Sequence, residues 1–426
     1  PGLERWRRVE AASAARVLEF TPRTPAQVEA AEEMRAVVAP QGEVLIEDPA
    51  GVLDPFFAGL LRTERNERGA VTRIVHYGDS PTTADLITAD LRQMLQRRFG
   101  DAGHGVHLLA KPWAWYGHRG IEVSAGGWQA APVTQRGEAD GWYGLGGVSF
   151  RGGTGAWSKF KLRGGRNSRL VMSYAGWPGA GVVTVEAGGA PVAEVETEME
   201  EPGVGRRTVE LPVGTADVEV RVRRGPVRLF GVSFESDGPG LLYDSVGLNG
   251  VSAAAMVYFM NEGHWANELR AARPSLIVLN YGTNESGFEK YIRTTYRDDL
   301  RKAIQRLKRA APDAALLVMS PMDRGVREGT GEIGTIAALP RLVEIQREVA
   351  REEGCAFFNT FEAMGGAGTM GKWYAAEPRL VSADFIHPLP AGGRVVANLV
   401  ERALMRGYNL YKLRLLRGAG MAEAGR

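Results

Sequence analysis

The sequence contains a single cysteine, Cys355, so no disulfide can form within the chain. This cysteine lies in the apolar stretch Gly-Cys-Ala-Phe-Phe, which is typical of an inert core residue. The six histidines show neither paired metal-ligand spacing nor a CxxC partner. We therefore expect no metal site and no cofactor.

The sequence also lacks a large net charge and long hydrophobic runs. The net charge is +2, which gives no electrostatic reason to expect nucleic acid or an anionic membrane as the main partner. No run of about 18 apolar residues is present, so we expect no transmembrane helix. The sequence shows no signal peptide and begins at Pro1 rather than Met, so the compartment cannot be read from it directly.

The length of 426 residues favours two domains, and the glycine content marks where they divide. From about residue 126 to 237 the chain is rich in glycine and in short runs of β-branched residues. Residues 218–222 alternate between valine and charged side chains, as in a half-buried antiparallel strand. This pattern predicts an inserted all-β sandwich over residues 126–237.

Strands alternate with helices on both sides of this insert. The later part of the chain predicts helices at residues 255–270, 296–310, 339–353 and 391–404, and strands at 275–281, 314–320 and 355–359. Alternation of this kind indicates an α/β domain, at residues 67–125 and 238–412, with a mostly parallel sheet covered on both faces. Residues 1–66 are expected to form a helical or mixed extension that packs on this domain, with helices at 11–18 and 25–38. Residues 413–426 are expected to form a frayed tail.

A possible nucleophile follows the first predicted strand. Residues 71–75 are rich in β-branched side chains and run into the turn Gly-Asp-Ser-Pro, which contains Ser80. Thr82, Thr83 or Asp85 can cap a helix that extends to about Phe99. Ser80 is therefore expected at the edge where open α/β sheets place their ligands. Taken alone, a Gly-Asp-Ser sequence is more often an ordinary turn.

Three later stretches supply complementary groups. Asp384 and His387 stand three residues apart before a proline, a spacing that brings a carboxylate to an imidazole and predicts a general base. Asn284 follows a buried strand and offers a side-chain N–H to an oxyanion. Gly250 ends the stretch Tyr-Asp-Ser-Val-Gly-Leu-Asn-Gly. It offers a backbone N–H to the same oxyanion, because glycine allows close approach. Each of these motifs, by itself, is also compatible with a structural turn.

Taken together, these four blocks resemble the SGNH (GDSL) hydrolase superfamily. The resemblance implies a flavodoxin-like three-layer α/β fold and ester hydrolysis. It implies Ser80 as nucleophile, His387 as base and Asp384 as the acid that orients it. It also implies an oxyanion hole formed by the Ser80 amide, Gly250 and Asn284. The leucine that usually follows the serine is replaced here by Pro81.

A closer resemblance extends over most of residues 73–410. The blocks His-Tyr-Gly-Asp-Ser-Pro, Tyr-Gly-Thr-Asn-Glu and Asp-Phe-Ile-His-Pro, with the β-rich insert between the first two, resemble bacterial peptidoglycan O-acetylesterases. In those enzymes a β-sandwich similar to a carbohydrate-binding module is inserted in the hydrolase domain. The resemblance implies an acetylated glycan polymer as substrate, and a periplasmic, cell-envelope or secreted location.

Aromatic residues in and before the insert are candidates for stacking on sugar rings. Trp142 and Trp177 lie within the insert, and Trp113 and Tyr116 belong to the stretch 113–118 that precedes it and is expected to line the rim. The alternative for each is an ordinary core position.

Several functions remain open at this stage. The chain could be another carbohydrate acetylesterase, for example on xylan, an acyl-esterase or thioesterase of the same fold, or a glycan O-acetyltransferase. A glycan-binding protein is the alternative that is not an enzyme.

Overall fold

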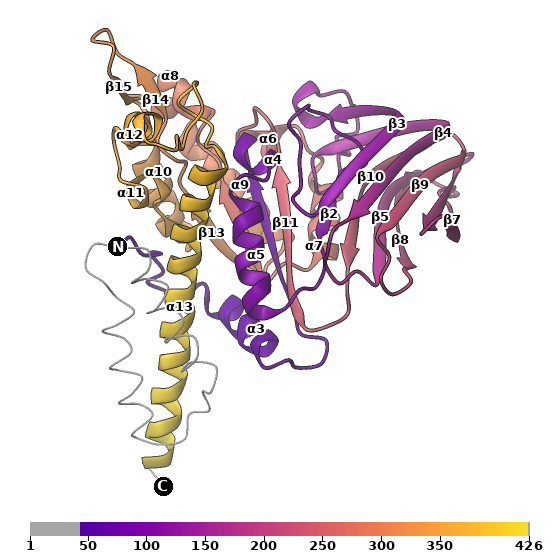
Figure 1. Cartoon of the computed structure of the whole chain (residues 1–426), viewed down its shortest axis with the longest axis horizontal. Coiled ribbons are helices and arrows are strands. Elements are labelled where there is room, and N and C mark those ends of the chain that lie inside the picture. The colour runs from indigo at the N-terminus through magenta and orange to yellow at the C-terminus, as the bar shows by residue number, and fades with distance from the viewer. Residues whose placement is uncertain (1–42, 425–426) are drawn as a thin grey trace.

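The computed structural model of the chain describes residues 43–424, and the helices predicted at residues 11–18 and 25–38 lie outside this range. Two units lie side by side in Figure 1: a parallel sheet with its helices, and an antiparallel β domain. The α/β class and the additional all-β unit predicted from the sequence are both confirmed.

Five parallel strands form the first sheet. Its spatial order is β11 (Gly240–Gly247), β1 (Val71–Gly78), β12 (Leu276–Asn280), β13 (Ala315–Met319) and β16 (Ala356–Phe358). Every neighbouring pair is parallel. Numbered within this unit the order is 2-1-3-4-5, which is the flavodoxin-like order. The strand order reverses between β1 and β12, since β11 was added on one side of β1 and the later strands on the other, so a ligand crevice is expected beyond the carboxyl ends of these two strands.

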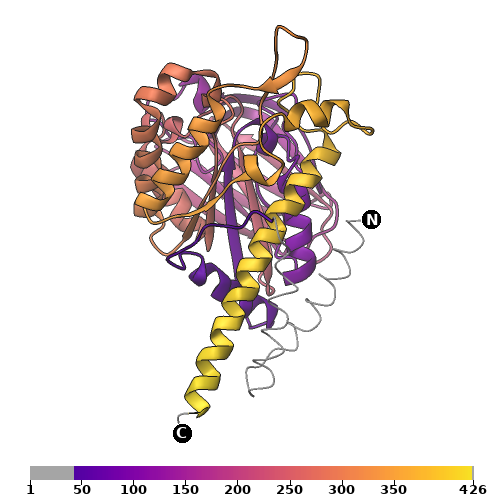
Figure 2. The same ribbon diagram turned by 90° about the vertical axis from the view of Figure 1, so that its left-hand side faces the viewer.

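Helices cover both faces of the parallel sheet (Figures 1 and 2). One face packs against α3 (Asp54–Glu64), α5 (Thr88–Phe99) and α13 (Pro390–Ala424). The other packs against α7 (Glu262–Ala272), α9 (Tyr296–Ala310) and α10 (Leu339–Glu352). Successive residues of β1 divide between the two layers, since Ile74 belongs to one core and Val75 to the other. The predicted strands are therefore apolar on both sides because both faces are covered.

Shorter elements complete the α/β unit. They are α4 (Ser80–Thr83), α6 (Ala254–Tyr258), α8 (Glu289–Thr294), α11 (Thr360–Ala363), α12 (Thr369–Ala375), β14 (Gly325–Arg327), β15 (Ile333–Thr335) and the 3₁₀ turn at Glu285–Gly287. A second 3₁₀ turn, Val133–Gln135, lies between β3 and β4 of the antiparallel domain.

Nine strands form the antiparallel domain. They are β2 (Gly105–His107), β3 (Ile121–Pro132), β4 (Val148–Leu162), β5 (Arg169–Gly176), β6 (Val182–Ala187), β7 (Ala190–Glu196), β8 (Gly203–Glu210), β9 (Asp217–Arg224) and β10 (Val227–Glu235). The beginning of β4 pairs with β10 and its end pairs with β9, so one long strand belongs to both parts of the sheet. Strand β2 pairs with β10, so the sheet takes in residues from 105 onward, ahead of the boundary expected at 126.

The two units share one hydrophobic core. Tyr77 from β1 and Trp265 from α7 belong to the same buried cluster as Leu229 from β10. A buried ion-pair network also joins them: Arg73 donates to Asp244 in β11 (Nε to Oδ2, 2.6 Å) and to Glu235 in β10 (Nη1 to Oε1, 2.9 Å). Because cores and charges are shared across the boundary, the antiparallel domain is part of one packed structure.

Three predicted elements differ from the observed ones. The helix expected at 255–270 is broken into α6 and α7. The helix expected from about Thr82 to Phe99 is broken into α4 and α5, and Asp85 between them has φ 54°. The prediction of a frayed tail from residue 413 is wrong, because α13 continues to Ala424. Tyr408 and Leu416 are buried, and Lys412 pairs with Glu64 of α3 (2.7 Å), so packing stabilises this part of the helix.

Candidate active site

Ser80 lies directly beyond the carboxyl end of β1, as the sequence predicts, at the start of the short helix α4. This helix lies very close to β11. A Cβ added at Gly247 would stand 2.0 Å from the backbone nitrogen of Thr83, so only glycine permits this approach. Asp85 does not cap a helix as predicted: its carboxylate is buried and pairs with Arg92 (2.6 Å). The turn after Ser80 is therefore fixed by backbone packing on one side and by a buried ion pair on the other.

Asp384 and His387 lie in a tight loop before α13. A bridge between Val381 and Pro388 closes the loop. Asp384 Oδ1 accepts hydrogen bonds from the backbone N–H of Ile386 (2.9 Å) and of His387 (3.0 Å), and from the hydroxyl of Ser382. Asp384 Oδ2 lies 2.6 Å from His387 Nδ1. The three-residue spacing therefore brings carboxylate and imidazole together through the loop rather than through a helical turn.

The same histidine reaches Ser80. His387 Nε2 lies 2.7 Å from Ser80 Oγ, although the two residues are 307 positions apart in the sequence. An imidazole whose Nδ1–H donates to Asp384 has a free lone pair on Nε2, so Nε2 accepts the hydroxyl proton of Ser80. The start of α13 fixes this contact, because Gly393 lies against the backbone of Leu86, where an added Cβ would stand 2.3 Å from the carbonyl oxygen.

Hydrogen bonding controls the charge of Asp384. Burial alone would raise the pKa of this carboxyl, but the hydrogen bonds from Ser382, His387 and two backbone amides outweigh burial and hold the pKa well below its usual range. Asp384 therefore remains a carboxylate that can orient the imidazole and stabilise its protonated form.

Two loops meet beyond the carboxyl ends of β11 and β12, the strands on either side of β1. The side-chain Nδ2 of Asn284 donates to the carbonyl of Val251 (2.9 Å), which ties the turn after β12 to the loop after β11. Gly250 in that second loop has φ 68° and no atom within 4 Å of a Cβ built on it. The amide group of Asn284 has two hydrogens, so one is still available after the bond to Val251. The structure thus brings together the strand ends that carry Ser80, Gly250 and Asn284.

Arg324 is a residue of this site that the sequence reasoning missed. It follows β13, and its Nη1 donates to the carbonyl of Thr283 (2.8 Å) and to the hydroxyl of Ser286 (3.1 Å). These two residues flank Asn284, so Arg324 braces the turn that carries the predicted oxyanion donor. The sequence could have indicated Arg324 by its position alone, because it follows β13, whose carboxyl end lies at the same edge of the sheet as those of β1 and β12.

The stretch 113–118 divides between core and rim. Tyr116 is buried, and its hydroxyl accepts from the amide of Leu108 (3.0 Å), so this predicted sugar-stacking residue is a core residue. Trp113 is half-buried against the core. Trp115 is 52% exposed, and its indole N–H donates to Asn249 (3.2 Å), next to Gly250. Trp115, rather than Tyr116, is therefore the aromatic residue of this stretch that lies open beside the site.

The two predicted tryptophans of the insert lie elsewhere. Trp142 is half-buried and stacks on His264 of α7, with ring centroids 5.5 Å apart. Trp177 is half-buried in the turn after β5, where its carbonyl accepts from the amide of Ala180 (3.0 Å). Within residues 43–424, no hydrogen bond or ring contact joins either ring to Ser80, His387 or Asn284.

Two buried acids lie beneath the site. Burial raises the pKa of Asp79 to about 6, although a hydrogen bond from Thr283 and the charge of His387 act in the opposite direction. Burial also raises the pKa of Glu285 to about 7, and the nearby charge of Asp79 adds to this effect. The Oε1 atom of Glu285 accepts from the amide of Ala253 (3.2 Å). Both acids adjoin residues of the predicted site, Ser80 and Asn284.

Neither a metal centre nor a membrane span is found in the part of the chain that the structure describes. No group of three or more histidine, cysteine or acidic side chains there has a geometry that could hold a metal ion. No helix between residues 43 and 424 combines the length and apolar character needed to cross a bilayer.

Comparison with known proteins agrees with this fold. The GDSL-like lipase/acylhydrolase family matches residues 215–395, a range that contains Gly250, Asn284, Asp384 and His387 but not Ser80. A comparison with curated proteins finds no match. A solved structure described as a peptidoglycan O-acetylesterase superposes with a TM-score of 0.71 at 22% identity, covering 88% of this chain and 99% of that one.

Other solved structures align with parts of the chain only. An acetyl xylan esterase covers 38% of this chain at 16% identity with a TM-score of 0.28. A carbohydrate-binding module from the Cellvibrio mixtus lichenase 5A covers 26% at 17% identity with a TM-score of 0.20. Superpositions this partial carry no argument about function.

The fold and the partial family match agree with a resemblance to the SGNH (GDSL) hydrolases, and together they support an esterase. The part of the chain that matches the GDSL-like lipases and acylhydrolases is similar to them, as the sequence resemblance predicted.

Proposed function

We propose that this protein is a serine esterase that removes O-acetyl groups from a cell-wall glycan, with peptidoglycan as the first candidate. The observation that carries the proposal is the hydrogen-bonded series Ser80, His387 and Asp384 at the carboxyl edge of the parallel sheet. Resemblance in sequence blocks and whole-chain similarity in fold to a peptidoglycan O-acetylesterase support the choice of substrate. A compartment outside the cytoplasm follows from that substrate.

In this mechanism Ser80 loses its proton to His387 Nε2 and attacks the acetyl carbonyl. The resulting oxyanion accepts hydrogen bonds from the free N–H of Asn284, from the Gly250 amide and from the Ser80 amide. His387 then gives the proton to the departing sugar oxygen, which leaves an acetyl-enzyme on Ser80. A water molecule, deprotonated by His387, attacks this ester and releases acetate. Asp384 keeps its negative charge throughout and orients the imidazole.

The decisive experiment compares p-nitrophenyl acetate, butyrate and octanoate as substrates. We expect hydrolysis of the acetate that falls as the acyl chain grows, and loss of about 10⁴-fold or more of turnover in Ser80→Ala. The matched control is Ser124→Ala, because Ser124 is exposed on β3 in the antiparallel domain. Turnover that survives in Ser80→Ala would refute the proposed nucleophile.

The substrate is tested separately with O-acetylated peptidoglycan and acetylated xylan. We expect acetate release from peptidoglycan and little from xylan. Release from xylan alone would assign a different carbohydrate acetylesterase. Transfer of acetyl to an added glycan acceptor, in place of acetate release, would assign a transferase.

A further inference from the structure

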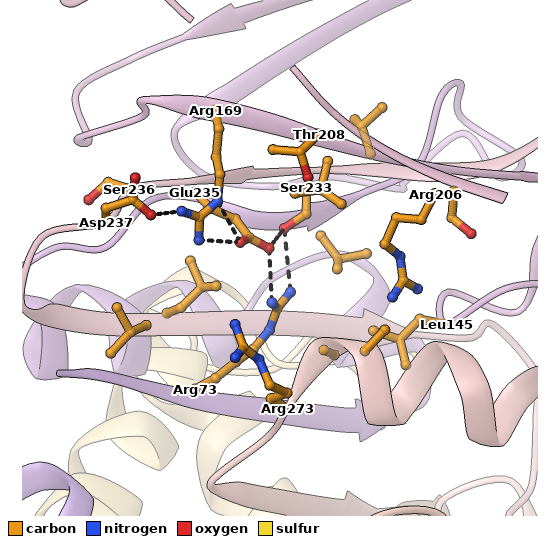
Figure 3. A pocket seen from close by; sticks show the side chains of 18 of the residues that line it. Arg73, Leu145, Arg169, Arg206, Thr208, Ser233, Glu235, Ser236, Asp237 and Arg273 are labelled. Atoms are coloured by element: carbon orange, nitrogen blue, oxygen red, sulfur yellow. Dashed lines mark hydrogen bonds and ion pairs between the residues drawn. The ribbon is translucent and has the colours of Figure 1, made fainter. Parts of the chain in front are cut away.

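A cavity of about 850 Å³ lies between the two units, far from Ser80. It opens at the amino end of β1, and its walls come from the end of α3, from the segments before β1 and β12, and from β5, β8 and β10 (Figure 3). Seven residues of β1 and its following turn separate Arg73 from Ser80, or about 20 Å at the usual strand rise. A cavity of this volume has the size of ordinary small-ligand sites.

Arginines dominate the charged lining. Six line the cavity: Arg62, Arg68, Arg73, Arg169, Arg206 and Arg273. Four acids also line it: Glu210, Glu235, Asp237 and Glu268. The lining therefore carries a surplus of two positive charges, although the whole chain is close to neutral.

Half of these arginines are held by ion pairs within the fold. In Figure 3, Arg169 and Arg206 project from the antiparallel sheet on one wall, and Arg73 lies on the other. Arg73 and Arg169 both pair with Glu235 (2.9 and 3.0 Å), and Arg206 pairs with Glu268 (3.1 Å). These three arginines have structural roles.

The other three arginines have no such partner. No hydrogen bond or ion pair joins the side chains of Arg62, Arg68 or Arg273 to another residue between positions 43 and 424. They come from three separate segments, so only the fold brings them to one cavity. The positive charges of these three arginines repel each other. An anion bound in the cavity would relieve this repulsion and accept hydrogen bonds from their planar guanidinium groups.

The remaining lining fits a saccharide. Hydroxyl groups of Thr208, Ser236 and Ser275 line the cavity beside apolar side chains such as Leu145 and Val171. Sugars present hydroxyl groups at their edges and an apolar face, and arginine recognises the carboxylates that acidic sugars carry. Mixed polar and apolar walls therefore suit an acidic sugar better than a purely inorganic anion.

We propose that this cavity binds an oligosaccharide that carries carboxylate groups, and that Arg62, Arg68 and Arg273 bind those groups. The site is distinct from the ester-hydrolysing site and does not depend on the assignment of Ser80. Its ligand would be held between the α/β unit and the antiparallel domain.

The test uses titration calorimetry with trigalacturonate on the full chain carrying Ser80→Ala, so that no ester is cleaved. The comparison ligand is the trimethyl ester of trigalacturonate, which has the same length without charge. A triple variant, Arg62→Ala with Arg68→Ala and Arg273→Ala, is made in the same background. The matched control, Arg65→Ala with Arg166→Ala and Arg351→Ala, removes the same charge at exposed positions that do not line the cavity.

We expect trigalacturonate to bind, the ester to bind at least about tenfold more weakly, and the arginine triple variant to lose at least about tenfold in affinity. The control variant should stay within about twofold, and added salt should weaken binding. Equal affinity of the arginine variant and its parent would overturn the proposal. Binding of inorganic tripolyphosphate without trigalacturonate would overturn the saccharide assignment. Hydrolysis of p-nitrophenyl acetate by the same arginine variants with Ser80 intact verifies folding and tests the esterase separately.

Discussion

Asn284 uses one amide hydrogen within the fold and has one left over. The first is donated to the carbonyl of Val251, so the side chain is already held in place before a substrate arrives. A donor that is fixed in advance stabilises an oxyanion without reorganisation during the reaction. In the proposed oxyanion hole, one amide hydrogen would hold the loop through Val251 and the other would donate to the oxyanion.

Replacement of Asn284 by alanine should therefore lower turnover about 10²- to 10³-fold, with little change in KM. Steady-state kinetics on p-nitrophenyl acetate measures this. Urea denaturation of the same variant measures the loss of stability from the broken hydrogen bond to Val251, which we expect to be about 1 kcal/mol. Unchanged turnover would remove Asn284 from the oxyanion hole.

Glu285 should make the protein less stable as pH rises. The pKa of its carboxyl is about 7 in the folded protein and 4.5 in the reference state. The unfolded chain therefore loses this proton first, and the free energy of unfolding falls between about pH 4.5 and 7. Over the full range this amounts to about 3 kcal/mol.

The variant Glu285→Gln has no such charge and should be more stable than the wild type at pH 8, by up to about 3 kcal/mol. At pH 4 the two should be similar. Urea denaturation at both values checks this prediction. An equal difference in stability at the two pH values would show that ionisation of Glu285 is not the cause.

Helix α4 depends on a glycine of the neighbouring strand. Gly247 at the end of β11 lets the backbone of Thr83 approach closely, and α4 begins with Ser80. The position of the predicted nucleophile is thus determined by contact between two main chains, not by its own side chain.

Substitution of Gly247 by alanine should displace α4, at a cost of about 1–3 kcal/mol in unfolding free energy. Turnover on p-nitrophenyl acetate should fall as well, because Ser80 moves relative to His387. Gly153→Ala is the control, since Gly153 has no atom within 4 Å of an added Cβ. If Gly247→Ala keeps both full activity and full stability, the close approach does not constrain the site.

Hydrophobic patterns predicted most of the elements of the α/β unit, because they depend on periods within one segment. The helix over residues 296–310 and the strands of the parallel sheet agree with the structure. The break at Asp85 and the long extent of α13 depend on contacts across the fold, of Asp85 with the Arg119 amide and of Lys412 with Glu64, that no local pattern contains.

The same reason limits what the sequence says about the site. Ser80, Asp384, His387 and Asn284 stand in recognisable blocks; the structure joins the first three by hydrogen bonds and ties Asn284 to Val251. Arg324 stands in no motif, because it reaches the site through contacts across the fold with Thr283 and Ser286. Trp115 lies in the stretch 113–118 that was expected to line the rim. The prediction that Tyr116 stacks on sugars is wrong, because the sequence does not distinguish a tyrosine in a core from one on a rim.

The stability of the whole molecule depends on the contacts between its two units. The buried cluster that contains Tyr77 and Leu229 crosses this boundary, and so does the network around Arg73. Deletion of the antiparallel domain would expose this core, so single substitutions are the better probes of that domain. We expect the two units to unfold together in one transition.

Arg73→Met should lower the free energy of unfolding by about 3–5 kcal/mol, because Asp244 and Glu235 lose a buried counter-charge. Arg166→Met, an exposed position outside this network, should change it by less than about 0.5 kcal/mol. Urea denaturation followed by tryptophan fluorescence measures both variants. A small effect at Arg73 would mean that the two carboxylates find other partners.

The separation of Ser80 and His387 along the chain also has a consequence for biosynthesis. The ribosome makes Ser80, Gly250 and Asn284 well before residues 384–387, and α13, whose first turn fixes the base against the nucleophile, is made later still. A nascent chain therefore holds Ser80 before it contains His387, the base that the proposed mechanism assigns to this serine. Under the proposed mechanism, ester cleavage can begin only after translation has passed residues 384–387 and α13 has folded against the α/β unit.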